Sequence, residues 1–288
     1  MTSRYDLFFN PPTFLLVLFN HQKKKVLHHK GFGKDLAKKY KISPDAIAQL
    51  IKQLAFHRMF GRPGVTYESA QTRKFQLGRT EVIRSASKES KEWVEAMLDP
   101  KVPVRPRFFN SLEIQIETRT IFFKSARRLN YLFNLAVVRH VQYATWAVDG
   151  QGVDRHLFGL KKMLKEGEPL PEIYTDPAFG LSSHWELSTS QLSSRYLDGW
   201  GYGEGEFHIY IYIYISCFYS YHITTLIFSF TVVPDGYGLS YSIGDDYIRW
   251  TITSMKRNTA ELKDHLAWAA SQVKTMIIVA KDIWITKL

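Results

Sequence analysis

Lysines gather directly before a predicted helix start in the first quarter of the chain. Lys34, Lys38, Lys39 and Lys41 precede Ser43-Pro44-Asp45. In this triplet serine is a preferred N-cap, proline favours the first helical position, and an acidic residue suits the positive end of the helix dipole. Lysines beside a helix N-terminus can act together on one phosphate group. The segment therefore predicts a phosphate clamp, with a solvated basic surface as the alternative interpretation.

Five further segments hold polar side chains at close spacing. Hydroxyl and arginine side chains fill Thr66-Tyr67-Glu68-Ser69-Ala70 and Gly78-Arg79-Thr80-Glu81-Val82-Ile83-Arg84-Ser85, which alone predict a polar loop leading into a strand. Gly152-Val153-Asp154-Arg155-His156-Leu157 is typical of a helix start with Asp154 as its cap. Leu187-Ser188-Thr189-Ser190-Gln191 predicts an edge strand, and Pro234-Asp235-Gly236-Tyr237-Gly238 predicts a turn.

Composition and missing motifs exclude several classes of function. The chain has 288 residues, 45% hydrophobic and 23% charged, which is typical of a globular protein. Its single cysteine, Cys217, excludes an internal disulfide framework and a cysteine-based zinc cluster. The sequence holds no Walker loop, G-x-G-x-x-G, H-E-x-x-H or G-x-S-x-G motif. The net charge of +11 favours anionic partners, but no recognisable nucleic-acid-binding module accompanies it, so we expect no nucleic-acid partner.

Helices alternating with short strands predict an α/β layered domain. One helix should run from Ser43 to Gly61, because Ile47, Leu50, Ile51 and Leu54 recur on one face. Further helices are predicted over 87–98, 135–148, 155–166 and 258–275, the second with Val138, Val141 and Thr145 facing inward. Strands are predicted over 239–242 and 247–252, joined by a turn at Gly244-Asp245-Asp246.

Two stretches depart from this order. Residues 102–133 show no sustained period, and 207–233 contain no Asp, Glu, Lys or Arg and include an Ile-Tyr repeat over 209–215. A membrane span over 207–233 is one interpretation by length, but strict alternation is a strand pattern and a lone strand cannot satisfy its backbone in lipid. An Ile-Tyr repeat is also what an AT dinucleotide repeat encodes. We therefore hypothesise translated intron sequence, with non-family insertions at about 102–134 and 205–231.

Five motifs, in this order along the chain, resemble those of the choline/carnitine acyltransferase family: Y-E-S, G-R-T-E, D-R-H-L-x-G-L, S-T-S-Q and P-D-G-Y-G. The resemblance is greatest to carnitine acetyltransferases of fungal type and covers about 31–101, 135–204 and 232–275. It implies a CoA-dependent acyltransferase-like domain, with a mixed β-sheet flanked by helices, incomplete and interrupted by irregular insertions. The expected organisation is an irregular leader over 1–29, a C-terminal-type domain over 30–275 and a tail over 276–288.

The resemblance also implies roles for individual residues in reversible transfer of a short acyl group between coenzyme A and carnitine. Ser190 would stabilise the oxyanion of the tetrahedral intermediate. The remaining roles are coenzyme A binding by Lys34, Lys38, Asp45 and Gln191, and carnitine binding by Tyr67, Ser69, Thr80, Arg155 and Ser188. An arginine with hydroxyl groups is a suitable charge-assisted clamp for the carnitine carboxylate. Acetyl-CoA would be a co-substrate, with no permanent cofactor and no metal.

One expected residue is missing. The family uses a histidine as general base in a His-x-x-x-Asp context, and none of the ten histidines here has an aspartate four residues later. His57, His140 and His156 lie within the segments that resemble the family, at positions that are not catalytic there. We therefore interpret the chain as the C-terminal half of the enzyme. Loss of a general base costs about 10²–10⁴-fold in rate, so we expect no useful turnover from this chain alone.

Two other functions stay open. The chain could be a residual coenzyme A-binding module without chemistry, or a membrane-anchored protein that uses 207–233, which the composition disfavours. We expect a monomer acting on small molecules. Resemblance points to the peroxisome or the mitochondrion, and Thr286-Lys287-Leu288 only approaches a peroxisomal S-K-L signal.

Overall fold

The computed structural model describes residues 23–104, 112–192, 199–201, 226–228 and 233–285. Within these ranges, only the backbone is described over 112–121, 199–201, 226–228 and 281–285. The suspected insertion at 205–231 therefore lies outside the described residues, apart from the short strand β6 (Leu226–Phe228), which pairs with β5 (Gly199–Gly201).

A six-stranded mixed sheet forms the centre of the structure. Its order is β1-β8-β7-β4-β2-β3. The bounds are β1 (Lys23–Lys30), β2 (Thr66–Gln71), β3 (Thr80–Ile83), β4 (Leu187–Gln191), β7 (Tyr237–Ile243) and β8 (Tyr247–Ser254). The β4 strand runs parallel to both of its neighbours, and the outer pairs are antiparallel. The predicted mixed sheet with flanking helices is confirmed.

Strand β4 lies inside the sheet, between β7 and β2. The prediction of an edge strand over 187–191 is therefore wrong. Its polar side chains suggested an exposed edge, but Ser188 and Thr189 are buried by neighbouring strands and helix. The predicted hairpin is confirmed, since β7 and β8 pair on either side of Gly244-Asp245-Asp246.

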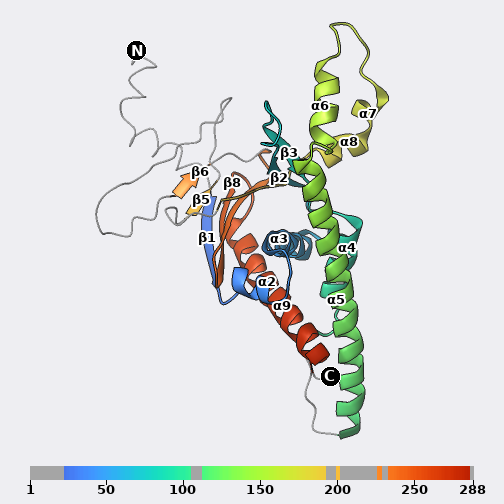
Figure 1. The fold of residues 1–288 in the computed structure, drawn as a ribbon, viewed down its shortest axis with the longest axis vertical. Coiled ribbons are helices and arrows are strands. Elements are labelled where there is room, and N and C mark those ends of the chain that lie inside the picture. The colour runs from blue at the N-terminus through green and yellow to red at the C-terminus, as the bar shows by residue number, and fades with distance from the viewer. Residues whose placement is uncertain (1–22, 105–111, 193–198, 202–225, 229–232, 286–288) are drawn as a thin grey trace, which may run out of the picture.

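Helix α3 (Pro44–Phe60) packs against one face of the sheet, together with α9 (Thr259–Ile285) and α5 (Leu112–Val148). Figure 1 shows α3 end-on between the sheet and α5. Both capping predictions for α3 hold. The Ser43 Oγ accepts a hydrogen bond from the Ala46 amide, and Gly61 ends the helix with a left-handed φ of 71°. The main hydrophobic core lies between this helix layer and the sheet.

Two smaller helices complete the layer. Helix α2 (Lys34–Lys39) precedes α3, and α4 (Lys88–Leu98) packs against α5. The α4 helix confirms the prediction over 87–98. It begins with a capping box in which Ser87 and Ser90 bond to each other's backbone amides.

At three predicted segment boundaries the structure forms regular elements. Residues 23–29 of the predicted irregular leader form strand β1, because their backbone pairs with β8 throughout. Residues 112–134 of the suspected insertion are helical, since α5 starts at Leu112, and Leu129 and Phe133 are buried in the core. Helix α9 continues through most of the predicted tail, because Met276 and Ile277 still face the core. Whether 102–134 derives from an intron stays a hypothesis.

The inward face of α5 also differs from the prediction. Val138 is 65% exposed and Val141 is 42% exposed, whereas Phe133, Ala136 and His140 are buried. The 135–148 segment alone gave too little of the period to fix the helix orientation.

Helices α6 (Asp154–Lys162), α7 (Glu172–Thr175) and α8 (Pro177–Ser182) form a projecting arm, which Figure 1 shows beyond the end of α5. None of these three helices contains a buried residue. The α6 helix is shorter than the predicted 155–166. Its N-cap is Val153, because the Asp154 carboxylate binds Arg84 instead of capping the helix.

Within the described part of the chain, no helix is both long enough and apolar enough to cross a membrane.

Candidate functional site

The alternation of strands β2 and β4 divides their side chains between two faces of the sheet. Glu68 and Thr189 are register partners and point toward α3, where Gln49 of that helix bonds the Thr189 hydroxyl. Tyr67 and Ser188 are the neighbouring partners and therefore point to the opposite face. The predicted carnitine-binding residues of both strands thus share one face, away from the helix layer.

Arg155 joins this face from the first turn of α6. Its Nη2 donates to the Tyr67 hydroxyl at 3.0 Å and lies 3.5 Å from the Thr80 Oγ1, while its Nε donates to the Thr80 carbonyl at 3.2 Å. The Ser69 hydroxyl donates to the Tyr67 hydroxyl at 3.3 Å. We call Tyr67, Ser69, Thr80 and Arg155 the Arg155 group.

The Arg155 group is suited to bind an anion. The Arg155 side chain is exposed, and among the described residues no carboxylate lies within ion-pair distance of its guanidinium. By contrast, nearby Arg84 is already neutralised by both oxygens of Asp154, at 2.6 and 3.0 Å. A guanidinium without a carboxylate partner, placed beside two hydroxyl groups, suits a carboxylate ligand.

Strand β4 carries three predicted site residues, of which Ser190 and Gln191 lie at its carboxyl end. Ser188 is 2% exposed, Ser190 is half-buried and Gln191 is exposed. The register places Ser190 opposite Ser240 of β7, on the same face as Ser188, and Gln191 opposite Tyr241 on the α3 face. The structure therefore brings Ser188 and Ser190 to the side of the sheet that also carries Tyr67.

The predicted phosphate clamp lies on α2. Lys34 and Lys38 are four residues apart and thus on one helix face, and Lys34 forms an ion pair with Asp245 of the β7–β8 turn at 3.2 Å. A surface hollow of about 280 Å³ at this helix is lined by Lys39 together with Asp35, Asp245 and Asp246, and neither Lys34 nor Lys38 lines it. In the described ranges, no hydrogen bond or ion pair connects Lys34 or Lys38 with the other predicted site residues.

A cluster of polar side chains is buried beneath the other face of β2. It consists of Asp45, Gln49, Lys52, Glu68, His140 and Tyr241. The Tyr241 hydroxyl lies 2.5 Å from the Asp45 Oδ1 and 2.6 Å from the Glu68 Oε1, and His140 Nε2 lies 3.1 Å from the Asp45 Oδ2. We call these six residues the buried cluster.

Burial and charge shift the pKa values of this cluster in different directions. Burial raises the pKa of Glu68, and the neighbouring Asp45 charge adds to that effect. Burial also acts to raise the pKa of Asp45, but the hydrogen bond and charge of His140, the Tyr241 hydrogen bond and Lys52 together lower it. Burial lowers the pKa of Lys52 to about 7, against the opposing charges of Glu68 and Asp45.

Asp45, Glu68 and His140 offer polar atoms within 4.8 Å of one another. Both Asp45 oxygens, the Glu68 Oε1 and the His140 Nε2 are engaged by the Tyr241 hydroxyl or by each other, and the Lys52 Nζ lies 3.5 Å from the centre of the Tyr241 ring. The cluster is therefore a network of hydrogen bonds with its own cation, and we do not assign it to a metal.

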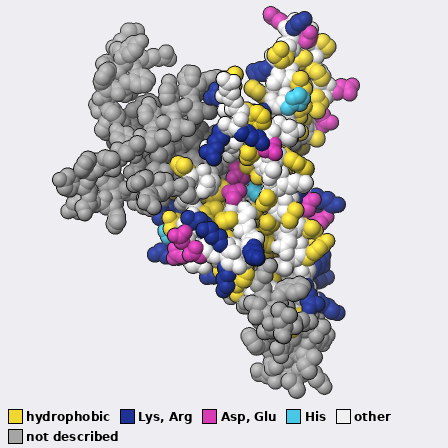
Figure 2. Space-filling view, viewed as in Figure 1, with side chains coloured by type: hydrophobic (Ala, Val, Ile, Leu, Met, Phe, Trp, Pro, Cys, Tyr) yellow, Lys and Arg dark blue, Asp and Glu magenta, His cyan; other side chains and the backbone are white. Residues whose placement is uncertain are grey.

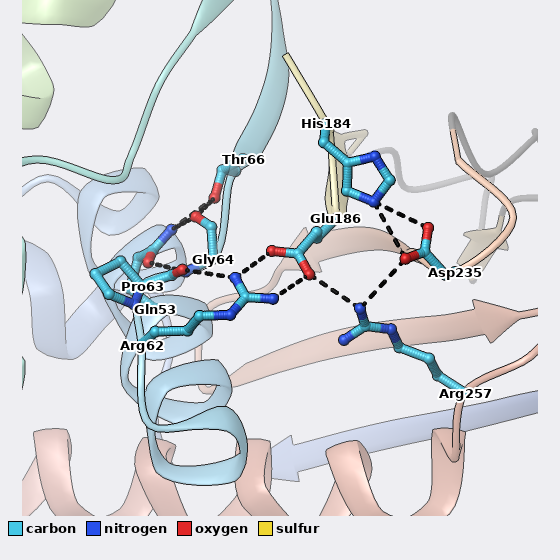
Figure 3. A network of polar contacts seen from close by, with 9 residues as sticks. All are labelled: Gln53, Arg62, Pro63, Gly64, Thr66, His184, Glu186, Asp235 and Arg257. Atoms are coloured by element: carbon cyan, nitrogen blue, oxygen red, sulfur yellow. Dashed lines mark hydrogen bonds and ion pairs between the residues drawn. The ribbon is translucent and has the colours of Figure 1, made fainter. Parts of the chain in front are cut away.

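A second polar network lies at the opposite end of α3 (Figure 3). Glu186, directly before β4, accepts two hydrogen bonds of 2.6 Å from Arg62 and one of 2.9 Å from Arg257. His184 pairs with Asp235 at 3.0 Å, and Asp235 approaches Arg257 at 3.7 Å. We call Arg62, His184, Glu186, Asp235 and Arg257 the Glu186 network. It fastens the start of β4 to α3 and to the start of α9.

Sequence reasoning missed the buried cluster apart from Asp45. It treated His140 as a core or surface histidine, and the structure shows it buried and bonded to Asp45. Glu68 gave one signal that could have been used, since it stands between Tyr67 and Ser69 in a strand and must face the interior when they face outward. The partner Tyr241 is 173 residues away and had no such signal.

The chain is similar in sequence to a known protein family and to several of its members. The profile described as Choline/Carnitine o-acyltransferase matches residues 15–268. Rat carnitine O-acetyltransferase is 33% identical over 258 residues, 88% of this chain and 33% of its own length. The mitochondrial carnitine O-acetyltransferase of Saccharomyces cerevisiae is 32% identical over 259 residues, 90% of this chain and 31% of its own length.

Other proteins that are similar to this chain carry different functional names. Mouse mitochondrial carnitine O-palmitoyltransferase 2 is 35% identical over 231 residues, 80% of this chain and 28% of its own length. Among solved structures, a wax ester synthase/diacylglycerol acyltransferase from Marinobacter aquaeolei VT8 matches with a TM-score of 0.38 and 7% identity, covering 94% of this chain and 57% of that one.

The chain spans about a third of the length of the curated relatives that it matches. The family profile, in contrast, covers most of the chain, including the five motifs that contain predicted site residues. This chain therefore belongs to the choline/carnitine O-acyltransferase family.

Proposed function

We propose that this chain forms the carnitine-binding and coenzyme A-binding part of a carnitine O-acyltransferase that transfers a short acyl group. The observation that carries the proposal is the Arg155 group, in which an exposed guanidinium without a carboxylate partner among the described residues meets the Tyr67 and Thr80 hydroxyls. Carnitine O-acetyltransferases are among its relatives, which supports the short acyl group.

In the proposed reaction the carnitine hydroxyl attacks the thioester carbonyl of an acyl-CoA. The carnitine oxygen forms the new ester bond, the bond to the coenzyme A sulfur breaks, and the hydroxyl proton ends on the released thiol. Arg155, Tyr67, Ser69 and Thr80 would hold the carnitine carboxylate, with Ser188 beside them. Ser190 would donate to the oxyanion of the tetrahedral intermediate.

The coenzyme A subsite would lie at the α2 end of the sheet. Lys34 and Lys38 share a helix face and would bind phosphate groups, with Lys34 exchanging Asp245 for the ligand. Asp45 and Gln191 would contact the same ligand from the α3 face. Figure 2 shows basic side chains above and below a central group of acidic and histidine side chains.

Carnitine binding tests the Arg155 group directly. We expect Arg155→Ala to weaken carnitine binding about 10- to 100-fold in calorimetric titration, because a charge-assisted hydrogen bond contributes about 1.5–3 kcal/mol. The carnitine affinity of Arg155→Lys should lie between those of the unmodified protein and Arg155→Ala, because lysine keeps the charge but cannot form two parallel hydrogen bonds. The matched control is Lys165→Ala, an exposed cation on the same arm. Equal affinities for Arg155→Ala and Lys165→Ala would refute the carnitine site.

Turnover tests the second part of the proposal. Because no histidine here stands in the His-x-x-x-Asp context of the family base, we expect no useful thiol release from acetyl-CoA and carnitine. Robust turnover that depends on this chain would overturn that expectation.

The second candidate function is a coenzyme A-binding module without chemistry. The lysines on α2 favour it, because they stand apart from the Arg155 group in the described contacts. Coenzyme A binding without carnitine binding would select this function. For both candidates, the mitochondrion and the peroxisome are the proposed compartments, and a relative named as mitochondrial supports the former.

A further inference from the structure

The hydroxyl group of Tyr241 lies between two carboxyl groups. Its oxygen is 2.5 Å from the Asp45 Oδ1 and 2.6 Å from the Glu68 Oε1, and it also accepts a hydrogen bond from the Gln49 Nε2 at 3.2 Å. Tyr241 and Glu68 are almost completely buried, at 1% and 4% exposure. Both carboxyl contacts are as short as hydrogen bonds to charged oxygen usually are.

The number of protons at this oxygen is limited. A phenol hydroxyl donates one hydrogen and accepts up to two. If both carboxyl groups were ionised, Tyr241 could donate its hydrogen to only one of them. The lone pairs of the other carboxylate would then face the phenol oxygen with no hydrogen between them and would repel it. Burial raises the pKa of the Tyr241 hydroxyl well above its ordinary value, so the phenol keeps its proton. One of the two carboxyl groups must therefore carry a proton and donate it to Tyr241.

The surroundings identify which carboxyl group that is. Asp45 keeps 39% of its side chain exposed and has the His140 Nε2 at 3.1 Å as a second partner. Glu68 is buried, and its Oε2 has no hydrogen-bond partner among the described residues. An ionised carboxylate is stabilised by solvent and hydrogen-bond donors, and both are at Asp45.

We propose that Glu68 is protonated in the folded protein and donates to Tyr241, which donates to ionised Asp45, and that this shared-proton bridge positions strand β2 against the start of α3. The positioning part rests on the function proposed above. Glu68 stands between Tyr67 and Ser69, so the bridge fixes the strand that presents both hydroxyls to carnitine. Its other end, Asp45, belongs to the proposed coenzyme A subsite. Glu68 and Tyr241 are thus positioning residues that connect the two substrate subsites.

The charged and titratable groups packed around Glu68 act in both directions: Asp45 favours the protonated form, whereas Lys52 and His140 oppose it. Lys52 comes from α3, His140 from α5, Tyr241 from β7 and Asp45 from the start of α3. Lys52 has the strongest opposing influence, but burial lowers its pKa to about 7 and its Nζ has no hydrogen-bond partner among the described residues. Burial of Glu68 and the Asp45 charge outweigh it, so the pKa of Glu68 lies above its ordinary value.

Infrared difference spectroscopy on the full chain tests the protonation. At neutral pH we expect the carbonyl stretch of one buried protonated carboxyl group in the unmodified protein. Glu68→Gln should abolish the band, and Asp45→Asn should leave it. A missing band in the unmodified protein would overturn the proposal, as would a band that is lost in Asp45→Asn and kept in Glu68→Gln. The unmodified protein alone decides the first point, even if a variant fails to fold.

The two amide variants also differ in a second measurement. A glutamine amide can donate to Tyr241 as a protonated carboxyl group does, so Glu68→Gln should keep the urea midpoint at neutral pH. Asp45→Asn removes the ionised acceptor and should lower it. The reverse order of midpoints would assign the proton to Asp45 and overturn the proposal.

Carnitine titration tests the positioning part. Tyr241→Phe breaks the bridge and should weaken carnitine binding about 2- to 10-fold, which corresponds to the loss of one ordinary hydrogen bond. The control is Tyr237→Phe, on the same face of the same strand, whose hydroxyl bonds the Asn258 carbonyl at 3.2 Å. In the unmodified protein, affinity should fall as rising pH ionises Glu68, and Glu68→Gln should remove that fall.

The outcomes separate the two proposals. Unchanged affinity in Tyr241→Phe, or the same pH profile in Glu68→Gln, would overturn the positioning role. If the unmodified protein did not bind carnitine, the proposed function and the positioning role would both fail, while the infrared band would still decide the protonation of Glu68.

Discussion

Two polar networks connect α3 to the sheet, one at each end of the helix, and they are built in opposite ways. In the Glu186 network, both carboxylate oxygens of Glu186 meet guanidinium donors. In the buried cluster, the Gln49 Oε1, Lys52 Nζ, Glu68 Oε2 and His140 Nδ1 are buried without hydrogen-bond partners among the described residues. Fully paired buried groups stabilise one conformation, whereas unpaired ones cost free energy. The first network is therefore structural, and the second keeps polar groups that folding alone does not require.

The largest expected effect comes from breaking the Glu186 network. Glu186→Ala leaves Arg62 and Arg257 without their shared carboxylate, and removal of one partner from a buried ion pair costs about 3–5 kcal/mol. Because the Arg62 side chain is 52% exposed, we expect the lower end of that range. Urea denaturation at neutral pH measures it, with exposed Glu166→Gln as the control. Equal stabilities of the two variants would contradict a structural role.

Acid should weaken the same network. Burial acts to raise the pKa of Glu186, but Arg62 and Arg257 lower it overall. A carboxyl group with a lowered pKa in the folded state contributes stability above its ordinary pKa and loses that contribution as the pH falls through the folded-state value. The stability difference between the unmodified protein and Glu186→Gln should therefore shrink below about pH 4.5. A difference that stays constant to pH 2 would show that Glu186 does not act through its charge.

The buried cluster should respond at alkaline pH instead. The pKa of Lys52 falls from 10.5 to about 7 because of burial. Between these values the unfolded chain holds a proton that the folded chain has released, so the Lys52 contribution to stability rises with pH. Its slope is at most about 1.4 kcal/mol per pH unit. Lys52→Met should remove this slope in urea midpoints measured from pH 7 to 10, and exposed Lys256→Met should keep it.

The smallest expected effect concerns the backbone that leads into the Glu186 network. Gly61 has a φ of 71°, and a Cβ there would meet no atom within 4 Å, so Gly61→Ala tests conformational strain alone. We expect a loss of about 1 kcal/mol. Gly159→Ala, inside α6 and also without a neighbour, should instead gain about 0.5–1 kcal/mol through helix propensity. Thermal unfolding of both variants compares them directly, and equal shifts would contradict the strain at Gly61.

The comparison also explains which parts of the structure the sequence could predict. Helix α3 was predictable because its signals are local: Ser43 caps one end and Gly61 the other. The first part of α5 was not recognised, although Phe122, Ala126, Leu129 and Phe133 recur at helical spacing, because arginines and phenylalanines between them obscure the period.

The site divides in the same way. The residues of the Arg155 group were predicted from motifs that resemble the family, and the structure brings these residues into contact. The bridge through Tyr241 depends on residues that are 173 and 196 positions apart. Their types are ordinary for a strand and a helix start, so only tertiary packing reveals the network.

The arm of α6, α7 and α8 has a consequence for how ligand binding would be observed. Its helices have no buried residue, so their amide hydrogens should exchange with solvent through local opening, far faster than those of α3. Arg155 stands in the first turn of α6 and is fastened to the sheet through Tyr67 and Thr80. A ligand held by Arg155 would bind only while α6 is folded, and by mass action it would slow amide exchange in that helix. Deuterium uptake by one poorly packed helix would then report occupancy of a site on the rigid sheet.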